Sequence, residues 1–131
     1  MFSFKATVQG QLMSKSNSRR LVMFGRRLAS IKSAKANAFT ESFILQSKAW
    51  DHKGWPYQGD VILTARVFLP SRRQDLDDSL LCDCIQKAGI LKNDRSIKGK
   101  QLFWALDRDK PRVSFWLEEW KEGWMANFKP F

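Results

Sequence analysis

The chain has 131 residues, the length of one domain large enough to bury a core of its own. Apolar residues form 44% of it, with ten Phe and six Trp, and this composition excludes a disordered protein. No stretch of about 18 apolar residues occurs, so no membrane-spanning helix is expected, and the formal net charge of +10 favours a polyanionic partner.

The first half of the chain predicts a strand, a loop and a helix. Residues 2–9 alternate apolar and polar side chains, as a half-buried strand does and a signal peptide does not. Residues 13–32 are polar, basic and rich in Ser, so we expect an irregular loop there. From about Ser33 to Lys48 apolar residues recur at helical spacing, which predicts a helix. Its apolar face would consist of Ala34, Ala38, Phe39, Phe43, Ile44 and Leu45.

A second strand and a second helix follow. Residues 60–69 are rich in Val, Ile, Leu and Phe and end before Pro70, which is typical of a strand. Residues 77–87 fit a helix that ends at Gly89, because glycine is favoured just beyond a helix C-terminus. The inner face of this helix would consist of Leu80, Leu81, Cys84, Ile85 and Ala88.

The last part of the chain predicts a polar loop at residues 91–100 and two strands at 102–106 and 113–117, joined by a hairpin loop. The order β-α-β-α-β-β predicts one small α/β (α+β) domain over residues 1–131, with a mixed four-stranded sheet and two main helices. The aromatic tail 120–131 suits either a short helix packed on the body or an interaction arm.

The two cysteines are not expected to form a disulfide or a zinc site. Cys82 and Cys84 lie two residues apart in a predicted helix, so their side chains point to different sides. The single histidine, His52, is distant in the sequence. Free thiols in a reducing cytoplasm are therefore the expected state.

The run from Arg72 to Asp78 places two arginines directly before three carboxylates, those of Asp75, Asp77 and Asp78. Three carboxylates this close repel one another unless something neutralises them. Mg²⁺ or Mn²⁺ would do so, because both prefer carboxylate oxygens and also bind substrate phosphates. The alternative is a solvated turn before a helix, where an N-terminal Asp is favoured by capping and by the helix dipole.

Positive charge is concentrated in the first half of the chain. Residues 1–59 contain ten Lys or Arg and two acidic residues, whereas residues 60–131 contain thirteen Lys or Arg and eleven acidic residues. Between positions 15 and 32 no acid occurs, and such a segment suits salt-sensitive contacts with phosphates. A solvated basic loop without a ligand is the alternative. The cations of this segment are Lys15, Arg19, Arg20, Arg26, Arg27 and Lys32.

Five segments of the chain occur in the order that a known nuclease family shows: Val61–Pro70, Arg72-Arg73, Asp75-Leu76-Asp77-Asp78, Lys87-Ala88-Gly89 and Asn93-Asp94. The pattern is a strand ending in Pro, a basic stretch, Asp-x-Asp-Asn at a helix start, a Gly and a further Asp. Over roughly residues 2–119 the chain resembles the RusA family of Holliday-junction resolvases. Lys15-Ser16-Asn17 is similar to the Pro-Ser-Asn loop of that family.

The resemblance implies a RusA-like fold and a homodimeric, Mg²⁺- or Mn²⁺-dependent endonuclease that cuts branched double-stranded DNA. It implies Asp75, Asp77 and Asp94 as metal ligands and catalytic residues, with Asp78 as a further ligand or water-positioning group. It also implies a cytoplasmic protein in a bacterial or phage-infected cell, with a phage or prophage origin. The expected DNA-binding residues are Lys15, Asn17, Arg19, Arg20, Arg26, Arg27, Lys32, Arg72 and Arg73.

The chain departs from the family at two positions. Asp78 replaces the Asn, and Leu81 replaces a Lys that would lie one helical turn beyond Asp77. Leu81 cannot stabilise developing charge, so the enzyme is expected to be slow or to use a cation such as Arg95 or Lys98 from the loop around Asp94. A non-catalytic DNA-binding protein on the same fold is the main alternative, and an RNA-binding module that stacks bases on Trp side chains is a weaker one.

Overall fold

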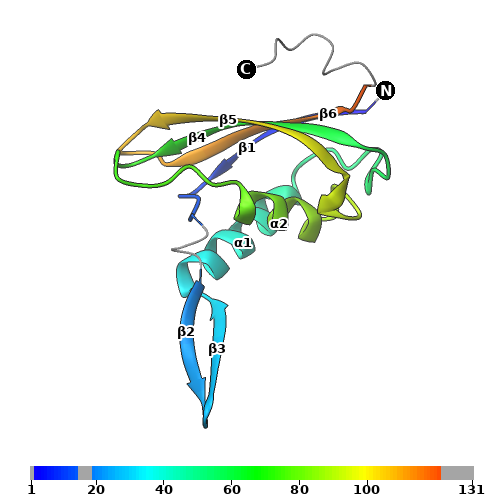
Figure 1. Ribbon diagram of the computed structural model, residues 1–131. Helices are drawn as coiled ribbons and strands as arrows, with labels where there is room; N and C mark the ends of the chain where they lie inside the picture. Colours follow the sequence, from blue (N-terminus) through cyan, green and yellow to red (C-terminus); the bar gives the residue numbers. More distant parts are fainter. Residues whose placement is uncertain (1, 15–18, 122–131) are drawn as a thin grey trace, which may run out of the picture.

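The computed structural model describes residues 2–14 and 19–121. Lys15, Asn17 and all but the first two residues of the aromatic tail lie outside these residues. Figure 1 shows the arrangement of the elements. In chain order they are β1 (Ser3–Gln9), β2 (Arg19–Phe24), β3 (Arg27–Lys32), α1 (Ala34–Ser47), β4 (Val61–Leu69), α2 (Ser79–Lys87), the 3-10 helix η1 (Asp94–Ser96), β5 (Ile97–Leu106) and β6 (Arg112–Glu119).

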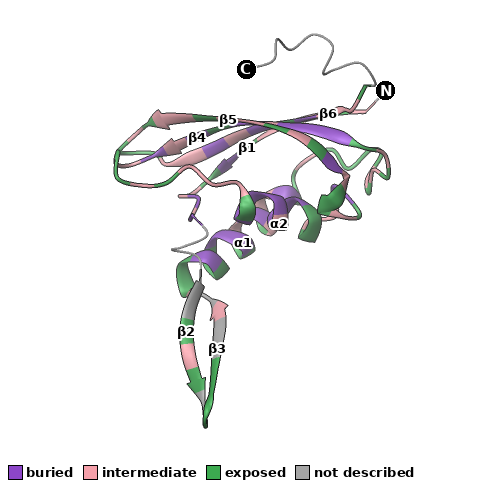
Figure 2. Ribbon diagram, viewed as in Figure 1, coloured by how far each residue is buried: buried purple, intermediate pink, exposed green. Residues whose placement is uncertain are grey.

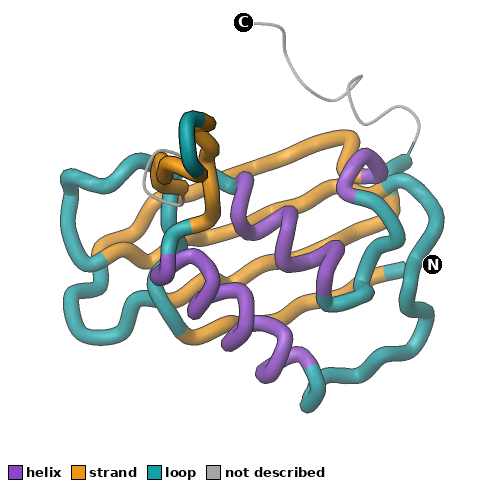
Figure 3. The backbone as a smooth tube through the Cα atoms, turned by 90° about the horizontal axis from the view of Figure 1, so that it is seen from below, coloured by secondary structure: helices purple, strands orange, loops and turns teal. Residues whose placement is uncertain are grey.

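A mixed four-stranded sheet forms the body of the protein, with the strand order β1-β6-β4-β5. β4 is parallel to β5, and the other two pairings are antiparallel. Both helices lie on the same face of this sheet, which Figures 1 and 3 show from two directions. The predicted mixed four-stranded sheet with two helices is therefore confirmed.

The hydrophobic core lies between the sheet and the two helices (Figure 2). Phe43 of α1 and Phe115 of β6 are fully buried, and their ring centroids lie 5.8 Å apart, within the range of favourable aromatic contacts. α2 adds Leu81 and Ile85, both fully buried. Burial of such side chains provides about 1.5–3 kcal/mol each, so this layer fixes where the N-terminus of α2 lies on the sheet.

α1 lies where it was predicted, but its buried face was predicted only in part: Phe39 and Phe43 are buried as expected, and the rest of the face differs. The side chain of Ser33 caps the helix by accepting from the Ala36 N–H at 3.2 Å. The buried face includes two polar residues, whose hydroxyls donate to helix carbonyls and are thereby satisfied. A prediction that counts only apolar residues omits these two, so it rotates the predicted buried face about the helix axis. The buried residues are Ala36, Phe39, Thr40, Phe43 and Ser47, whereas Ala34, Ala38 and Leu45 are exposed.

The basic segment predicted as an irregular loop is instead a β-hairpin formed by β2 and β3. Its turn consists of Gly25 and Arg26, and Gly25 has a φ of 64°, which glycine adopts without strain. Figure 1 shows the hairpin extending away from the sheet and helices. Leu21, Met23 and Leu28 remain exposed, so no burial pattern marks these strands in the sequence.

The last two strands also differ from the prediction. β5 begins at Ile97, inside the segment that was predicted to be a polar loop. The start of this strand is partly exposed to solvent and carries Lys98 and Lys100, which give it the polar composition of a loop. β5 and β6 do not form a hairpin, since each pairs with a different edge of β4. Residues 107–111 instead cross the end of β4, where the Asp107 N–H donates to the carbonyl of Leu69 at 2.9 Å.

α2 was predicted to within two residues at its start, and Gly89 follows its C-cap with a φ of 88°. Both Cys82 and Cys84 are buried and free, which confirms the absence of a disulfide between them. Within the described part of the chain, neither helix is long and apolar enough to cross a membrane.

Candidate functional site

The acidic run lies at the N-terminus of α2, after the connection from the end of β4. Asp77 Oδ1 accepts hydrogen bonds from both the backbone N–H and the hydroxyl of Ser79, each at 2.8 Å. Asp77 therefore caps the helix start, where the helix dipole also favours its charge. Asp78 stands at the N-cap position itself but makes no capping hydrogen bond with its side chain.

The carboxylate of Asp78 forms an ion pair with a lysine of the sheet. Lys100 of β5 places its Nζ 2.8 Å from Oδ2 of Asp78, and the same oxygen accepts from the Cys82 thiol at 3.2 Å. The Asp78 side chain is 16% exposed, whereas that of Lys100 is 46% exposed. The pair thus joins the start of α2 to the sheet while one end of it remains open to solvent.

These contacts shift the pKa values of all three groups. Burial raises the pKa of Asp78, but the hydrogen bonds from Lys100 and Cys82 and the lysine charge outweigh it, so the net pKa is lowered. The hydrogen bond to Asp78 raises the pKa of Lys100 against the opposing effect of burial. Burial raises the pKa of Cys82 to about 12, and the charges of Asp78 and Asp94 act in the same direction. Cys82 is therefore a protonated, unreactive thiol at neutral pH.

The Asp78–Lys100 pair should stabilise the fold only within a defined pH window. The lowered pKa of Asp78 gives a contribution present above its unfolded value of about 3.9 and lost as pH falls through the folded value. The raised pKa of Lys100 gives a second stabilising contribution, which is fully present below the unfolded pKa of about 10.4 and is lost as pH rises through the pKa in the folded protein. Because Lys100 is 46% exposed, we expect less than about 1 kcal/mol.

Urea denaturation of the wild type and of Lys100→Met would measure this contribution as a function of pH. The wild type should be the more stable protein at neutral pH, and the difference should narrow toward about pH 2 as Asp78 becomes protonated. A difference of the same size at both ends of this range would show that the pair does not titrate as described.

Asp75 precedes Asp78 in the sequence, and Asp94 lies between Asp78 and Lys100. Asp75 is exposed on the connection before α2, and Asp94 is exposed on η1. The Asp94 N–H donates to Oε1 of Gln86 at 3.3 Å, which fixes η1 against α2. The charge of Asp94 is among those that raise the pKa of Lys100, so it acts on the same region as Asp78.

A divalent cation fits the chemistry of this region, although the side chains are not gathered around one. Asp75, Asp77 and Asp94 offer the carboxylate oxygens that Mg²⁺ and Mn²⁺ prefer. Over residues 2–14 and 19–121, no group of three or more His, Cys, Asp or Glu is close enough to hold an ion. A buried oxygen, Oε1 of Gln74, has no hydrogen-bond partner in the described structure, and it belongs to a residue next to Asp75. An amide oxygen is a further hard ligand, so the residue types of this segment, but not the present placement of their side chains, suit such an ion.

The residue at the position of the family's helix lysine lies in the core. Leu81 is fully buried, which confirms the expectation that it belongs to the inner face of α2. Lys87, near the end of the helix, pairs with Asp83 at 3.2 Å on the exposed side. The structure holds Lys100 beside Asp78. Arg95 and Lys98, the cations suggested by the sequence, are exposed, and a role for them stays a prediction.

Three arginines line a hollow of about 530 Å³ at the end of the sheet where β4 finishes. Arg72 and Arg73 come from the connection that also carries the acidic run, and Arg108 comes from the connection between β5 and β6. The guanidinium of Arg72 lies over the ring of Trp104, 5.5 Å from its centroid. This cluster combines like charges, which an anion would neutralise.

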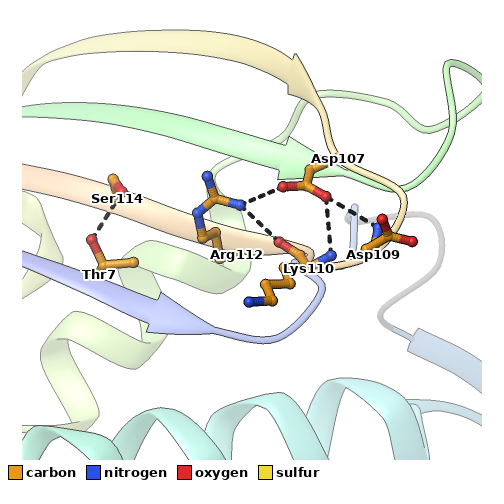
Figure 4. A network of polar contacts seen from close by, with 6 residues as sticks. All are labelled: Thr7, Asp107, Asp109, Lys110, Arg112 and Ser114. Atoms are coloured by element: carbon orange, nitrogen blue, oxygen red, sulfur yellow. Dashed lines mark hydrogen bonds and ion pairs between the residues drawn. The ribbon is translucent and has the colours of Figure 1, made fainter.

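The connection that carries Arg108 is held by a network of polar contacts around Asp107 (Figure 4). The Asp107 carboxylate accepts from the backbone N–H groups of Asp109 and Lys110, each at 3.1 Å, and from Nη1 of Arg112 at 2.7 Å. The hydrogen bond from Arg112 is the largest of the effects that lower the pKa of Asp107. These contacts order the turn and thereby place Arg108 beside the arginines of the neighbouring connection.

Apart from Lys15 and Asn17, which lie outside the described residues, the remaining predicted DNA-binding residues belong to the hairpin, which extends away from the sheet and helices (Figure 1). Arg26 is in its turn and Arg27 begins β3, and both side chains are exposed. For Arg19, Arg20 and Lys32 the structure places the backbone in β2 and β3 and not the side chain.

Sequence reasoning missed two residues of this region. Lys100 was assigned to a polar loop, and only its pairing opposite Leu63 of β4 shows that it faces α2. Arg108 lies in the mixed-charge run Asp107-Arg108-Asp109-Lys110, which looks like a solvated turn. The alternation of Lys98 and Lys100 with Ile97 and Gly99 was the one available signal of a strand at this place.

Comparison with known proteins adds no assignment to these observations. The sequence matches no protein-family model, and no curated protein matches it. The resemblance to the RusA family therefore rests on the motifs of this chain alone, and what it implies about function is a proposal.

Proposed function

We propose that this protein is a metal-dependent, structure-selective endonuclease that hydrolyses phosphodiesters in branched DNA, such as a four-way junction. One observation carries the proposal: a single connection, between β4 and α2, holds both Arg72 and Arg73 of the arginine cluster and the carboxylates of Asp75 and Asp77. Phosphate-binding groups and ligands for a cation thus adjoin one another. In this proposal a phosphate bound by the arginines would lie only a few residues along the chain from the carboxylates that would hold the ion.

In this proposal Asp75, Asp77 and Asp94 hold Mg²⁺ or Mn²⁺. When bound, the ion lowers the pKa of a water ligand and offsets the charge that develops on the phosphate. The helix cap made by Asp77 orients its carboxylate, because Oδ1 is fixed by two hydrogen bonds from Ser79. Arg72 and Arg73 bind the phosphates that flank the cut. In the overall reaction a water oxygen bonds to phosphorus, the bond to one sugar oxygen breaks, and that oxygen takes up a proton.

The proposal includes a homodimer in the cytoplasm of a bacterial or phage-infected cell. Two sites on one dimer would cut two strands of a branched duplex, and this spacing would provide the selectivity for shape. The net charge of +10 supports a polyanionic substrate.

A comparison of two substrates tests this function. The wild-type protein with Mg²⁺ should nick a synthetic four-way junction and leave a linear duplex made from the same arm sequences largely intact. Equal cleavage of both substrates would contradict selectivity for structure. Absence of cleavage with Mg²⁺ and with Mn²⁺, under conditions where the junction is bound, would contradict the endonuclease itself.

The hairpin should contribute to DNA affinity through phosphate contacts. Changing both Arg26 and Arg27 to Ala should weaken junction binding and flatten its salt dependence, by roughly 0.9 log units of binding constant per log unit of salt for each lost contact. Both side chains are exposed, so stability should change little. Binding measured over a series of salt concentrations gives the slope, and an unchanged slope would place the hairpin tip away from the DNA. Lys53→Ala, at an exposed position outside the hairpin, is the control.

A non-catalytic DNA-binding protein is the second candidate, and a specific observation favours it. Asp77 caps α2 and Asp78 pairs with Lys100, so both carboxylates have a role in the fold that needs no metal. This alternative predicts tight junction binding without cleavage, and binding that is unaffected by a chelator. The comparison of the two substrates described above distinguishes the two candidates.

A further inference from the structure

Lys100 occupies an unusual position for a lysine. It lies on the face of the sheet that the helices cover, opposite Leu63 of β4, and Leu63 is fully buried. Its ammonium group reaches the N-terminus of α2, where Oδ2 of Asp78 lies 2.8 Å away. Asp78 directly follows Asp77, so this places a cation beside the carboxylates of the candidate site.

The Asp78–Lys100 ion pair contributes too little to the stability of the fold to explain why a lysine occupies this position. A half-exposed ion pair contributes at most about 1 kcal/mol, and apolar residues in place of a buried pair are often neutral or stabilising. The pair also engages a carboxylate oxygen that could otherwise bind a cation. What the pair achieves is to hold the ammonium group of Lys100, whose side chain is 46% exposed, at Asp78, the residue that directly follows Asp77.

We propose that Lys100 is a catalytic residue that contacts the phosphate being cut, and that Asp78 is the positioning residue that holds it there. The inference rests on the proposed endonuclease function. An ammonium group has three donors, so Lys100 can keep its hydrogen bond to Asp78 and donate to a non-bridging phosphate oxygen. Charge that grows on this oxygen during hydrolysis is then offset by a cation that is already in place.

The first variant to compare is Lys100→Met, which keeps the length and apolar stem of the side chain. It should cleave a four-way junction at least about 100-fold more slowly under single-turnover conditions, as removal of one preorganised donor does in other enzymes, and should bind the junction with unchanged affinity. Lys53→Met is the matched control, because Lys53 is exposed on the loop before β4, outside the candidate site, and this variant should cleave at the wild-type rate. Wild-type cleavage by Lys100→Met would overturn the inference and leave the endonuclease proposal standing.

A double variant separates contact with the phosphate from a role in the fold. Asp78→Asn combined with Lys100→Met removes both charges, so no unpaired carboxylate remains and folding is protected. If Lys100 contacts the phosphate, the double variant should be as slow as Lys100→Met. If the only role of Lys100 is to neutralise Asp78, cleavage should return toward the wild-type rate, which would overturn the inference.

Restoring the amine chemically gives a third measurement. Lys100→Cys treated with 2-bromoethylamine carries an S-aminoethyl side chain, formed when the thiolate displaces bromide, and this side chain closely matches lysine. Cys82 and Cys84 are buried, so the exposed thiol at position 100 should react selectively. We expect untreated Lys100→Cys to be slow and the alkylated protein to regain at least a tenth of the wild-type rate. No recovery in a folded, alkylated protein would contradict the inference. A wild-type protein that never cleaves would instead remove the endonuclease proposal, and this inference with it.

Discussion

Replacing Leu81 by Lys is expected to destabilise the protein by roughly 3–5 kcal/mol, because an ammonium group without a partner would be buried. Leu81 is fully buried on the inner face of α2, where its neighbours are apolar. The change also removes the packing of a leucine. Chemical denaturation at neutral pH should show the loss, and at this magnitude a small domain is close to unfolding at physiological temperature.

The control for this variant is Leu45→Lys on α1, where the leucine is 68% exposed. Its stability should stay within about 0.5 kcal/mol of the wild type. If Leu81→Lys were as stable as Leu45→Lys, position 81 would have access to solvent and the described register of α2 would be wrong. The same result would allow a cation at this position to reach the candidate site.

Asp77→Asn should abolish cleavage, with a loss of roughly 1,000-fold or more, because a neutral amide is a much weaker ligand for Mg²⁺ than a carboxylate. Stability should change little, since the amide oxygen of Asn can still accept the hydrogen bond from the Ser79 N–H. Junction affinity should be equal or higher, because a negative charge near phosphate is removed. Cleavage and binding assays on the same junction measure both effects.

Asp83→Asn on α2 is the matched control for Asp77→Asn. Asp83 pairs with Lys87 on the exposed side of the helix, so the variant removes a carboxylate from the same helix but not from the site. It should cleave at the wild-type rate. Near-normal cleavage by Asp77→Asn would remove Asp77 from the site and leave it only as the helix cap.

The parts of the fold that bury an apolar face could be predicted from the sequence. α2 was found because Leu80, Leu81, Cys84 and Ile85 recur at helical spacing and Gly89 ends the helix. β4 was found because most of its residues are apolar, and every second one from Val61 to Leu69 is buried. In each case burial imposes a periodicity on the sequence that can be read without the structure.

The parts that the sequence did not reveal depend on contacts between distant segments. The β2–β3 hairpin leaves Leu21 and Met23 exposed, so its strands carry no pattern of burial. The acidic run was recognised as a candidate site, but the engagement of Asp78 by Lys100 depends on the alignment of β4 with β5. Such an alignment is set by tertiary packing, and local sequence does not encode it in a readable form.

The dependence of junction cleavage on the divalent cation tests the central claim most directly. The initial rate of cleavage by the wild-type protein would be measured from an excess of chelator up to millimolar Mg²⁺, and again with Mn²⁺. Metal-dependent hydrolysis through Asp75, Asp77 and Asp94 predicts no cleavage with the chelator and a rate that rises to a plateau with either ion. Cleavage that persists at the same rate in chelator, or a bound junction that stays intact at every concentration of both ions, would contradict it.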